Sequence, residues 1–320
     1  MGKAVEDFAA GRRRVGIGRP GKELFGAGGV TKRELAEHYR RVAPVMLPHV
    51  RGRPLALHRF PDGIDPGASG TPGFFQKNLP EYTPEWVRGV RVERMHGDPI
   101  TMPVCDDTAT LLWLADQAAI TLHPWTTRAA ALRRPDRMVI DLDPPGRDFA
   151  AARRAARDVR EVLAEVALAG YVMTTGSRGL HVVVPLRPEE DIDAVRDLAR
   201  GIADTAARRH PDRLTTEVRK NRRGGRLFLD TMRNSYAQHS VAPYAVRALP
   251  GAPVATPLSW SELERAGSAQ VWAVRSLPRR LAELADRGDP WHALGRHARS
   301  PRRAGERLAR LAGAGGAGRG

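Results

Sequence analysis

Cysteine is almost absent from this chain, and its scarcity excludes two kinds of architecture. The 320 residues contain a single cysteine, Cys105. One thiol cannot close an internal disulfide, and it cannot supply the thiolate ligands of a cysteine-based zinc cluster. This usage is typical of proteins in a reducing compartment, so we expect a cytoplasmic location.

Long apolar runs are also missing. No stretch approaches the roughly 20 consecutive apolar residues that span a bilayer. The run Arg12–Arg14 is not followed by the apolar core of an export signal. We therefore expect a soluble protein without a membrane partner.

Acidic residues are outnumbered by basic ones. The chain has 52 Lys plus Arg against 36 Asp plus Glu, a formal net charge of +16. Such a balance favours a polyanionic partner, nucleic acid before a membrane surface. Lysine is nevertheless scarce while arginine, alanine and glycine are abundant, so part of the excess can reflect the base composition of the gene.

Two carboxylates end a short apolar run at Met138–Pro145. Side chains alternate along a strand, so Asp141 and Asp143 share one face. Like charges at that spacing repel unless a proton or a cation intervenes, and Mg²⁺ or Mn²⁺ is the natural guest of such oxygen ligands. The alternative is a strand end that faces water, the more common meaning of an isolated D-x-D.

A regular alternation of strands and helices begins at this point. The order is β-α-β-β-α-β, the split βαβ or ferredoxin-like unit that RNA-recognition modules and polymerase palms also use. The predicted strands cover residues 138–143, 171–174, 180–185 and 226–230, and the predicted helices cover residues 149–169 and 191–209.

The sheet order of such a unit is 4-1-3-2, so its first strand lies between the fourth and the third. Asp141 and Asp143 then neighbour Asp230 on one side and His181 on the other. Three carboxylates on one sheet face suit two-metal phosphoryl transfer. His181 has an alternative role as a buried, hydrogen-bonded core residue.

The residues before this unit contain shorter signals. Thr31 and Glu34 form a capping box for a helix that we expect to end at Pro44. Further elements are predicted as strands at 54–60 and 87–95 and as a helix from Asp107 or Thr108 through Ile120, followed by His123. Residues 1–21 are polar and glycine-rich, and we expect them to be flexible.

Two local patterns favour contact with nucleic acid. Phe74, Phe75 and Lys77 lie in a loop bounded by glycine and proline, where bases can stack and a phosphate can pair. We expect one of the two rings to point inward. Lys22 and Lys32 flank a glycine-rich turn and would then lie near one surface; two solvated lysines are the alternative.

The residues after the second helix are strongly basic. The segment 208–226 carries eight Arg or Lys against two acids and includes Arg222 and Arg223, which suits a polyanion as well as a solvated loop. Arg233 and Arg247 could bind a triphosphate through bidentate hydrogen bonds. Arg247 stands at the end of a predicted strand. Residues 262–288 are predicted helical, and the tail 299–320 disordered.

These residues together resemble a known family, the polymerase domain of the bacterial ATP-dependent DNA ligase of non-homologous end joining, in the archaeo-eukaryotic primase superfamily. The resemblance runs from about Lys22 to Trp260. Its marks are Val30-Thr31-Lys32, Arg51-Gly52-Arg53-Pro54-Leu55, Phe74-Phe75-Gln76-Lys77, His123-Pro124-Trp125, Asp141-Leu142-Asp143-Pro144, Gly179-Leu180-His181, Phe228-Leu229-Asp230 and Ala242-Pro243-Tyr244-Ala245-Val246-Arg247.

The resemblance implies an α+β primase-polymerase fold, with an N-terminal α/β subdomain at about 22–130, a ferredoxin-like catalytic palm at about 135–260 and C-terminal helices at about 262–298. It implies catalysis by Asp141, Asp143 and Asp230 with two Mn²⁺ or Mg²⁺ ions. It also implies that the nucleotide, with ribonucleotides preferred, contacts His123, Thr175, Arg178, His181, Arg233 and Arg247. DNA contacts are expected at Lys22, Lys32, Phe74, Phe75, Lys77, Arg222 and Arg223, with the lysine pair at a 5′-phosphate.

Three positions depart from the family pattern: Thr175 replaces Ser, Arg178 replaces Lys, and Leu249 replaces an Arg. No K-x-D-G ligase motif is present, so we expect a stand-alone, nucleoid-associated module that fills gaps and extends ends on gapped or broken duplexes. Its partners would be NTP or dNTP, Ku and a separate ATP-dependent ligase. A primase that starts chains and a non-catalytic DNA-end-binding protein are the alternatives.

Overall fold

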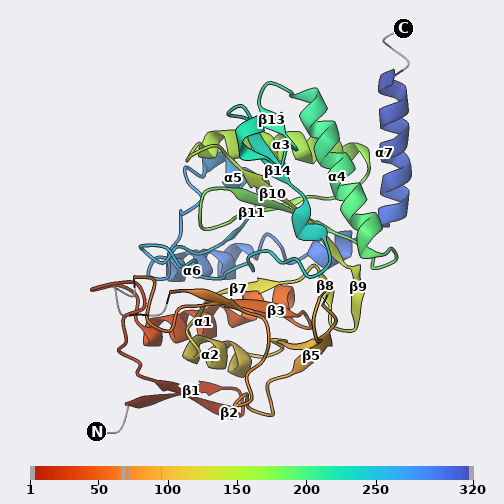
Figure 1. Cartoon of the computed structure of the whole chain (residues 1–320). Helices are drawn as coiled ribbons and strands as arrows, with labels where there is room; N and C mark the ends of the chain where they lie inside the picture. The colour runs from red at the N-terminus through yellow and green to blue at the C-terminus, as the bar shows by residue number, and fades with distance from the viewer. Residues whose placement is uncertain (1–3, 66–69, 71, 95, 317–320) are drawn as a thin grey trace. The chain divides into compact units, whose positions relative to one another are not determined.

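The computed structural model describes residues 4–65, 70, 72–94 and 96–316 (Figure 1). The chain folds into two compact units, each assembled from separate segments. The first unit comprises the described residues up to Trp125 together with Val241–Thr256 and Gln270–Asp289, and the second comprises Thr126–Ser240, Pro257–Ala269 and the described residues from Pro290 onward. Residues 241–256, which the sequence analysis placed in the palm, thus belong to the first unit.

Helices and small sheets build the first unit. Its elements are β1 (Val5–Ala10), β2 (Arg13–Gly18), α1 (Lys32–Val50), β3 (Leu55–Arg59), β4 (Phe74–Gln76), β5 (Gly89–Val92), β6 (Ile100–Pro103), α2 (Thr108–Asp116), β7 (Ala119–Pro124) and α6 (Leu277–Arg287). The central sheet has the strand order β4-β3-β7, and β1-β2 and β5-β6 are two-stranded hairpins.

The first long helix starts as predicted but continues further. The Thr31 hydroxyl accepts a bond from the Glu34 amide at 3.2 Å, and the Glu34 carboxylate accepts one from the Thr31 amide at 2.9 Å. The predicted stop at Pro44 is wrong, because α1 runs to Val50 through two prolines. Met46 and Val50 are fully buried in that last stretch, and burying their side chains offsets the roughly 3 kcal/mol that an internal proline costs.

The second helix ends earlier than predicted. It stops at Asp116 rather than Ile120, and the chain turns through Ala118, whose φ is 53°. β7 then begins at Ala119. His123 therefore lies on β7, an edge strand that pairs with the central strand β3, opposite Ala56, instead of just after a helix.

The second unit is built on a six-stranded sheet. Its elements are β8 (Thr127–Arg128), β9 (Ala131–Pro135), β10 (Arg137–Asp143), α3 (Phe149–Glu165), β11 (Tyr171–Thr174), β12 (Leu180–Pro185), α4 (Ile192–Arg209), β13 (Leu214–Thr215), η1 (Lys220–Arg222), β14 (Leu227–Asp230), η2 (Met232–Asn234), β15 (Pro257–Leu258), α5 (Trp260–Arg265), η3 (Leu294–His297) and α7 (Pro301–Gly316).

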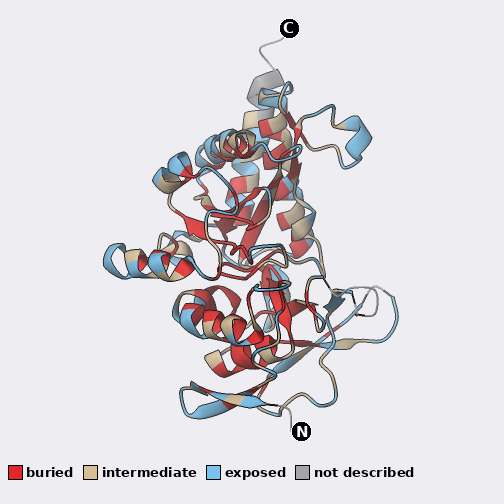
Figure 2. Cartoon of the chain, turned by 90° about the vertical axis from the view of Figure 1, so that its left-hand side faces the viewer, coloured by how far each residue is buried: buried red, intermediate tan, exposed pale blue. Residues whose placement is uncertain are grey.

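The strand order of this sheet confirms the predicted topology. It reads β13-β14-β10-β12-β11-β15, so the inner four strands stand in the order 4-1-3-2 of a split βαβ unit. α3 and α4 bury apolar stripes at helical spacing, with polar faces outward. Figure 2 shows the corresponding pattern, with the sheet strands mostly buried and the outer helix surfaces exposed.

Both chain ends carry structure that the sequence analysis did not expect. Residues 5–18 form the β1-β2 hairpin instead of a flexible segment, because Phe8, Val15 and Ile17 bury apolar side chains. Residues 301–316 form α7 instead of a disordered tail. α7 packs on α4, where the Leu308 side chain covers Gly201, and Arg302 bonds Glu190 at 2.7 Å. Residues 1–3 and 317–320 lie outside the described part.

Two further predictions near the C-terminus differ from the structure. The predicted strand at 241–247 is reduced to a single bridge between Val246 and Val254. The predicted helical stretch 262–288 is two helices, α5 and α6, separated by residues 266–276. A mixed α+β fold with a ferredoxin-like sheet is nevertheless what the sequence predicted.

A buried asparagine completes the strand that carries the acids. β14 pairs with β10 only over Asp141–Asp143, so Val139 has no strand partner on that side. The Asn234 side chain takes its place: it accepts from the Val139 amide at 2.8 Å and donates to the Val139 carbonyl at 2.7 Å and the Thr231 carbonyl at 2.8 Å. Asn234 is fully buried.

We predict that Asn234→Ala lowers the free energy of unfolding by roughly 2–4 kcal/mol, because it leaves buried backbone groups of β10 without partners. Urea denaturation measures the loss. Asn221→Ala, a substitution at an exposed site in η1, is the matched control and should change the free energy by less than about 0.5 kcal/mol. Equal stability of the two variants would show that Asn234 does not support β10.

Candidate active site

Three acids and a histidine meet on one face of the second unit's sheet. Asp141 stands directly opposite Asp230 on β14 and directly opposite His181 on β12. Direct cross-strand neighbours point to the same face, and so does Asp143, two residues along. The intervening Ile140 and Leu142 are fully buried on the other face. The predicted convergence of these side chains is therefore what the register produces.

Each acid lies beside a cationic side chain of the same unit. The Arg233 Nε is 3.4 Å from an Asp141 oxygen and 3.7 Å from an Asp230 oxygen. Asp143 has an Arg178 nitrogen at 3.1 Å and an Arg223 nitrogen at 3.9 Å. These guanidinium groups offset the repulsion between the carboxylates.

The two facing acids have opposite pKa shifts. Burial by itself would raise the pKa of Asp141, but His181 at 3.5 Å and Arg233 outweigh it and hold the pKa below its ordinary value. Burial raises the pKa of Asp230, and the neighbouring Asp141 charge adds to the rise, against a bond from the Met232 amide. Asp141 is thus the firmly ionised member of the pair.

A tight turn closes over the end of β10. Gly179 lies so close that a Cβ on it would stand 2.0 Å from the Leu142 carbonyl oxygen, which only glycine avoids. The Thr175 hydroxyl donates to the Gly179 carbonyl at 3.1 Å and accepts from the Gly179 amide at 3.3 Å. Thr175 is buried and shapes the turn that presents Arg178, whose side chain is half exposed.

His181 combines burial with an unsatisfied ring nitrogen. It is 3% exposed, and its Nδ1 has no hydrogen-bond partner in the part of the chain that the structure describes. A buried polar atom of this kind is rare in a packed core. The other ring nitrogen, Nε2, faces an Asp141 oxygen at 3.5 Å.

The two arginines of the basic loop behave differently. Arg222 is exposed. Arg223 is folded inward: its guanidinium stacks over the Phe228 ring at 3.8 Å and donates to the Glu217 and Val218 carbonyls at 3.0 and 2.9 Å. Arg223 therefore fixes the loop and faces Asp143, while a DNA contact at Arg222 stays a prediction.

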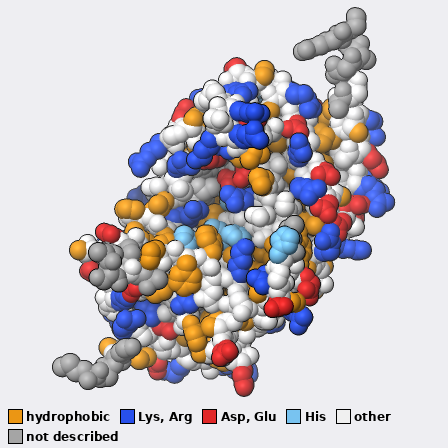
Figure 3. All heavy atoms as spheres, in the orientation of Figure 1, with side chains coloured by type: hydrophobic (Ala, Val, Ile, Leu, Met, Phe, Trp, Pro, Cys, Tyr) orange, Lys and Arg blue, Asp and Glu red, His pale blue; other side chains and the backbone are white. Residues whose placement is uncertain are grey.

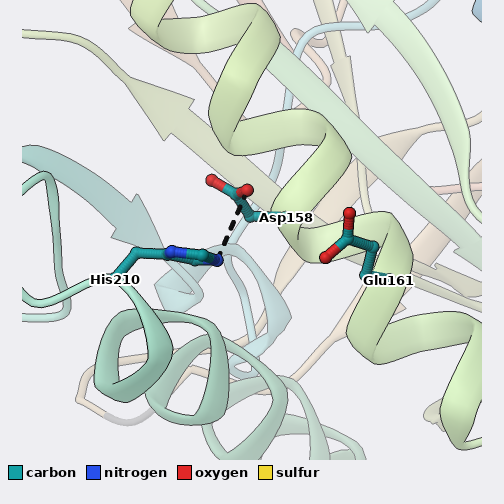
Figure 4. A group of neighbouring side chains, drawn as sticks. All are labelled: Asp158, Glu161 and His210. Atoms are coloured by element: carbon teal, nitrogen blue, oxygen red, sulfur yellow. Dashed lines mark ion pairs between the residues drawn. The ribbon is translucent and has the colours of Figure 1, made fainter.

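The described residues also contain a second possible metal-ligand group, on the helices of this unit. Ligand atoms of Asp158, Glu161 and His210 lie within 4.8 Å of one another, and Figure 4 shows the Asp158–His210 pair. Both Asp158 oxygens also accept bonds from Arg213, at 2.7 and 3.2 Å. Because the Arg213 guanidinium bonds both Asp158 oxygens, we interpret this group as an ion-pair cluster. The sequence analysis did not identify it.

The first unit gathers the predicted aromatic residues around a histidine. The Phe75 ring stacks on His58 at 4.4 Å with 7° between the planes, and its edge meets His123 at 5.3 Å. Phe74 and Phe75 are 39% and 49% exposed, so the expectation that one ring points inward is wrong. The adjacent strands β3 and β4 hold both rings at the surface, and Lys77 follows in an exposed position.

Lys22 and Lys32 line one pocket of about 280 Å³ in the first unit, as their spacing predicted. The Lys32 ammonium is buried and bonds Asp116 at 2.6 Å and the Gly18 carbonyl at 2.8 Å. A cation in the first turn of a helix is unfavourable because it lies at the positive end of the helix dipole. Here the Asp116 carboxylate, rather than a bound ligand, compensates the Lys32 charge. Lys22 bonds Asp62 at 3.1 Å and is more accessible.

Arg59 joins this pocket to the aromatic residues, and sequence reasoning missed it. Arg59 lines the pocket, donates to Gln76 at 2.5 Å, and lies 5.6 Å from the Phe74 ring centre. Its place on a strand predicted at 54–60, next to the expected aromatic loop, was the available signal. His58, on the same strand, was missed for the same reason.

Arg247 belongs to the first unit with His123. Its backbone amide bonds the Pro253 carbonyl at 2.7 Å, which fixes the chain there without a strand. Burial lowers the pKa of His58, and the Arg247 charge adds to the lowering. Arg247, His58, Phe75 and His123 thus form one neighbourhood of cationic and aromatic groups.

Comparison with known proteins identifies the family. Residues 31–291 match the family model described as LigD, primase-polymerase domain. The chain belongs to the LigD primase-polymerase family. The domain of this family is a nucleotidyltransferase of the primase-polymerase type.

Three relatives illustrate the similarity. The Multifunctional non-homologous end joining protein LigD of Pseudomonas aeruginosa is 36% identical over 262 residues, 82% of this chain and 30% of that protein. The Bifunctional non-homologous end joining protein LigD of Bacillus subtilis is 32% identical over 246 residues, 76% of this chain and 38% of that protein. The polymerase domain of Mycobacterium tuberculosis Ligase D, solved in complex with DNA, has a TM-score of 0.79 and 32% identity over 89% of this chain and 99% of that domain.

The chain spans about a third of the length of these curated LigD relatives. Within residues 4–65, 72–94 and 96–316, no helix is both long and apolar enough to cross a bilayer. The fold predicted from the sequence resemblance, a LigD-type polymerase domain, is confirmed.

Asp141 and Asp230 have opposite pKa shifts. We therefore predict that neutralising each of them, in the presence of a chelator, has opposite effects on the stability of the fold. Asp230→Asn should raise the melting temperature at pH 7, because the carboxylate whose pKa is raised by burial weakens the fold once ionised. The gain should vanish as pH falls through that raised pKa. Asp141→Asn should lower the free energy of unfolding at pH 7 by roughly 1–3 kcal/mol, since it removes the partner of His181 and Arg233.

The Asp141→Asn loss should persist through mildly acidic pH and fade only below the ordinary pKa of 3.8, where wild-type Asp141 itself takes up a proton. Calorimetry in chelator between pH 7 and pH 3 measures both variants beside the wild type. Shifts of the same sign for the two variants at pH 7 would contradict the assigned charge balance.

Proposed function

We propose that this LigD-family chain is a template-dependent nucleotidyltransferase that fills gaps and extends ends in double-strand break repair by non-homologous end joining. The observation that carries the proposal is the register of β10, which sets Asp141, Asp143 and Asp230 on one sheet face beside His181. Three oxygen-donor side chains in one place suit the transfer of a phosphoryl group.

The donor set fits two Mn²⁺ or Mg²⁺ ions, because both prefer carboxylate oxygens. When bound, such ions would neutralise the charge that develops on the transferred phosphate. Arg178 and Arg233 now pair with the acids, through side chains that are 50% and 38% exposed. With such ions on the carboxylates, Arg178 and Arg233 would be free to hold phosphate oxygens.

We propose nucleotide contacts for the residues that the sequence resemblance assigned to the nucleotide. In the second unit, Thr175 shapes the turn that presents Arg178, and His181 stands beside Asp141 with its Nε2 toward the carboxylate. In the first unit, we assign His123 and Arg247 to nucleotide recognition. NTP and dNTP are both candidate substrates, and we propose that ribonucleotides are preferred.

DNA recognition rests on the first unit's exposed rings and its cationic pocket. Phe74 and Phe75 offer stacking surfaces for bases, with Lys77 close by. Lys22, Lys32 and Arg59 line a pocket that suits a 5′-phosphate at a gap. Lys and Arg side chains are spread over the visible surface in Figure 3, which suits a polyanion.

The relatives' names suggest the setting of this activity. They are called non-homologous end joining proteins, and a solved LigD polymerase domain was in complex with DNA. We propose a gapped or broken duplex as the substrate, action at the nucleoid in the cytoplasm, and Ku and an ATP-dependent ligase as partners.

We predict that Asp141→Asn, Asp143→Asn or Asp230→Asn lowers nucleotide addition to a gapped duplex by about 100-fold or more, because each removes a carboxylate that would hold a metal ion. Single-turnover extension with Mn²⁺ and each nucleotide type measures the rate. Glu161→Gln, which alters the helix cluster of Asp158 and His210 instead, is the matched control and should retain the wild-type rate. Full extension by any of the three variants would refute the assignment.

We also predict that the wild type binds and extends a gapped duplex better when its downstream strand carries a 5′-phosphate. Lys22→Ala should reduce this preference by roughly ten- to a hundredfold, the value of a charge-assisted bond. The Lys32→Ala substitution is combined with Asp116→Asn, because Lys32→Ala alone would leave the Asp116 carboxylate without its ion-pair partner. Nucleotide KM should not change in either variant.

The same duplex without the phosphate is the control, and affinity is read by fluorescence anisotropy. A wild type that is indifferent to the phosphate would make the lysines structural. It would weaken the end-joining role in favour of priming.

A further inference from the structure

A short segment of the first unit, Ala242–Arg247, leads to Arg247 without the support of a strand. At its start the Ala242 amide bonds the Leu122 carbonyl of β7 at 2.9 Å, and at its end the Arg247 amide bonds the Pro253 carbonyl at 2.7 Å. Side chains of α1 and β7 supply further bonds between these two points.

Two neighbouring side chains of α1 bond the backbone of this segment. The His38 ring, 2% exposed, donates from Nε2 to the Tyr244 carbonyl at 2.9 Å. The Tyr39 hydroxyl, fully buried, accepts from the Val246 amide at 3.4 Å and donates to the Ile120 carbonyl at 2.6 Å. α1 thus holds the segment at two successive places.

Both side chains are in the protonation state that these bonds require. Burial lowers the pKa of His38 to about 4, and the nearby Arg41 charge adds to the lowering, against the bond to Tyr244. The ring is therefore neutral at pH 7, and its proton is on Nε2 because a carbonyl can only accept. Burial also raises the pKa of Tyr39, so its hydroxyl keeps the proton that it donates.

The peptide group that joins Val246 to Arg247 is held at both of its ends. The Thr121 hydroxyl of β7, 1% exposed, donates to the Val246 carbonyl at 2.7 Å. The amide of the same peptide group is the Arg247 amide that bonds Pro253. Because a peptide group is planar, the two bonds fix the direction in which the Arg247 side chain leaves the backbone.

The segment also contains a residue in a rare backbone conformation. Tyr244 has a φ of 65°, in the left-handed region that residues with a Cβ seldom adopt. Its side chain is fully buried, and its hydroxyl donates to Asp289 at 2.9 Å. Such a conformation persists only where the surroundings over-determine it, and residues of this kind gather at ligand sites. The bond from His38 is one of the contacts that hold it.

We propose that His38 and Tyr39 are positioning residues for the nucleotide, which act through Arg247. This inference rests on the proposed function, in which Arg247 binds the nucleotide. Neither side chain touches the nucleotide itself, since both are buried against the segment. Through the segment they hold Arg247 beside His58, whose pKa its charge lowers.

The test measures nucleotide affinity with and without chemistry. Calorimetric titration with ATP and Mn²⁺, in the absence of DNA, gives Kd, and extension of a gapped duplex gives KM and kcat. His38→Leu should raise Kd and KM about tenfold, because a misdirected Arg247 loses a charge-assisted bond. The kcat at saturating nucleotide and the affinity for the duplex should stay at the wild-type values.

His38→Gln is the conservative variant. Its side-chain amide can donate to the Tyr244 carbonyl in place of Nε2, so Kd should return to within about twofold of the wild type. A His38→Gln variant as weak as His38→Leu would overturn the role assigned to this bond.

Tyr39→Phe tests the same role with a smaller change, which keeps the inference testable if His38→Leu does not fold. Its KM should rise while kcat is unchanged. In a variant that combines Tyr39→Phe with Arg247→Gln, KM should equal that of Arg247→Gln alone, because Tyr39 acts through Arg247. Additive effects of the two substitutions would overturn the inference.

His49→Leu is the matched control. His49 is a second buried histidine of α1, eleven residues and therefore roughly 16 Å further along the helix. The substitution should lower the melting temperature and leave nucleotide Kd and KM unchanged. A rise in Kd as large as that of His38→Leu would show that both variants act through the stability of α1, which would overturn the inference.

Failure of the proposed function is a separate outcome. A wild type that binds ATP but extends no duplex would refute the transferase, while the Kd values of the variants would still decide the positioning role. Unchanged Kd in both His38→Leu and Tyr39→Phe would overturn the positioning role and leave the transferase standing. A wild type that binds no nucleotide would refute the role of Arg247 and this inference with it.

Discussion

The register of β10 is the constraint on which the acid cluster of the second unit depends. Asp141 must stand opposite Asp230 on one side and His181 on the other, and this follows only when β10 lies between β14 and β12. A slip of one residue would turn the carboxylates to the helix-covered face and Ile140 and Leu142 to the solvent. Burial of those two side chains therefore holds the acids in place.

A cluster of carboxylates brings its own difficulty, and arginines of the same unit resolve it. Arg233 lies between Asp141 and Asp230, while Arg178 and Arg223 lie beside Asp143. Arg178 and Arg233 are accessible, and in the proposed function they exchange the acids for phosphates, whereas Arg223 is stacked on Phe228 and stabilises the fold. The same residue type thus has two roles, which burial separates.

The first unit shows how neighbouring strands connect separate contacts. Arg59 on β3 reaches the cationic pocket, Gln76 and Phe74, and His58 on the same strand supports Phe75. In the proposed function, β3 carries both Arg59, which lines the 5′-phosphate pocket, and His58, which stacks on Phe75 beside the template. A gap presents both features at once, and a strand is stiff enough to hold the two contacts in a constant relation.

The sequence alone determined what short-range rules can determine. Alternating side chains placed Asp141 and Asp143 on one face, the order of elements indicated the split βαβ sheet, and the capping box began α1 at the right residue. Tertiary packing decided the rest. Burial carried α1 through Pro44 and Pro48 and ordered β1-β2 and α7. Asp116, Asn234 and Arg223 acquired their roles from partners 84, 95 and 80 positions away along the chain, Lys32, Val139 and Asp143, and no local pattern records a partner at such a distance.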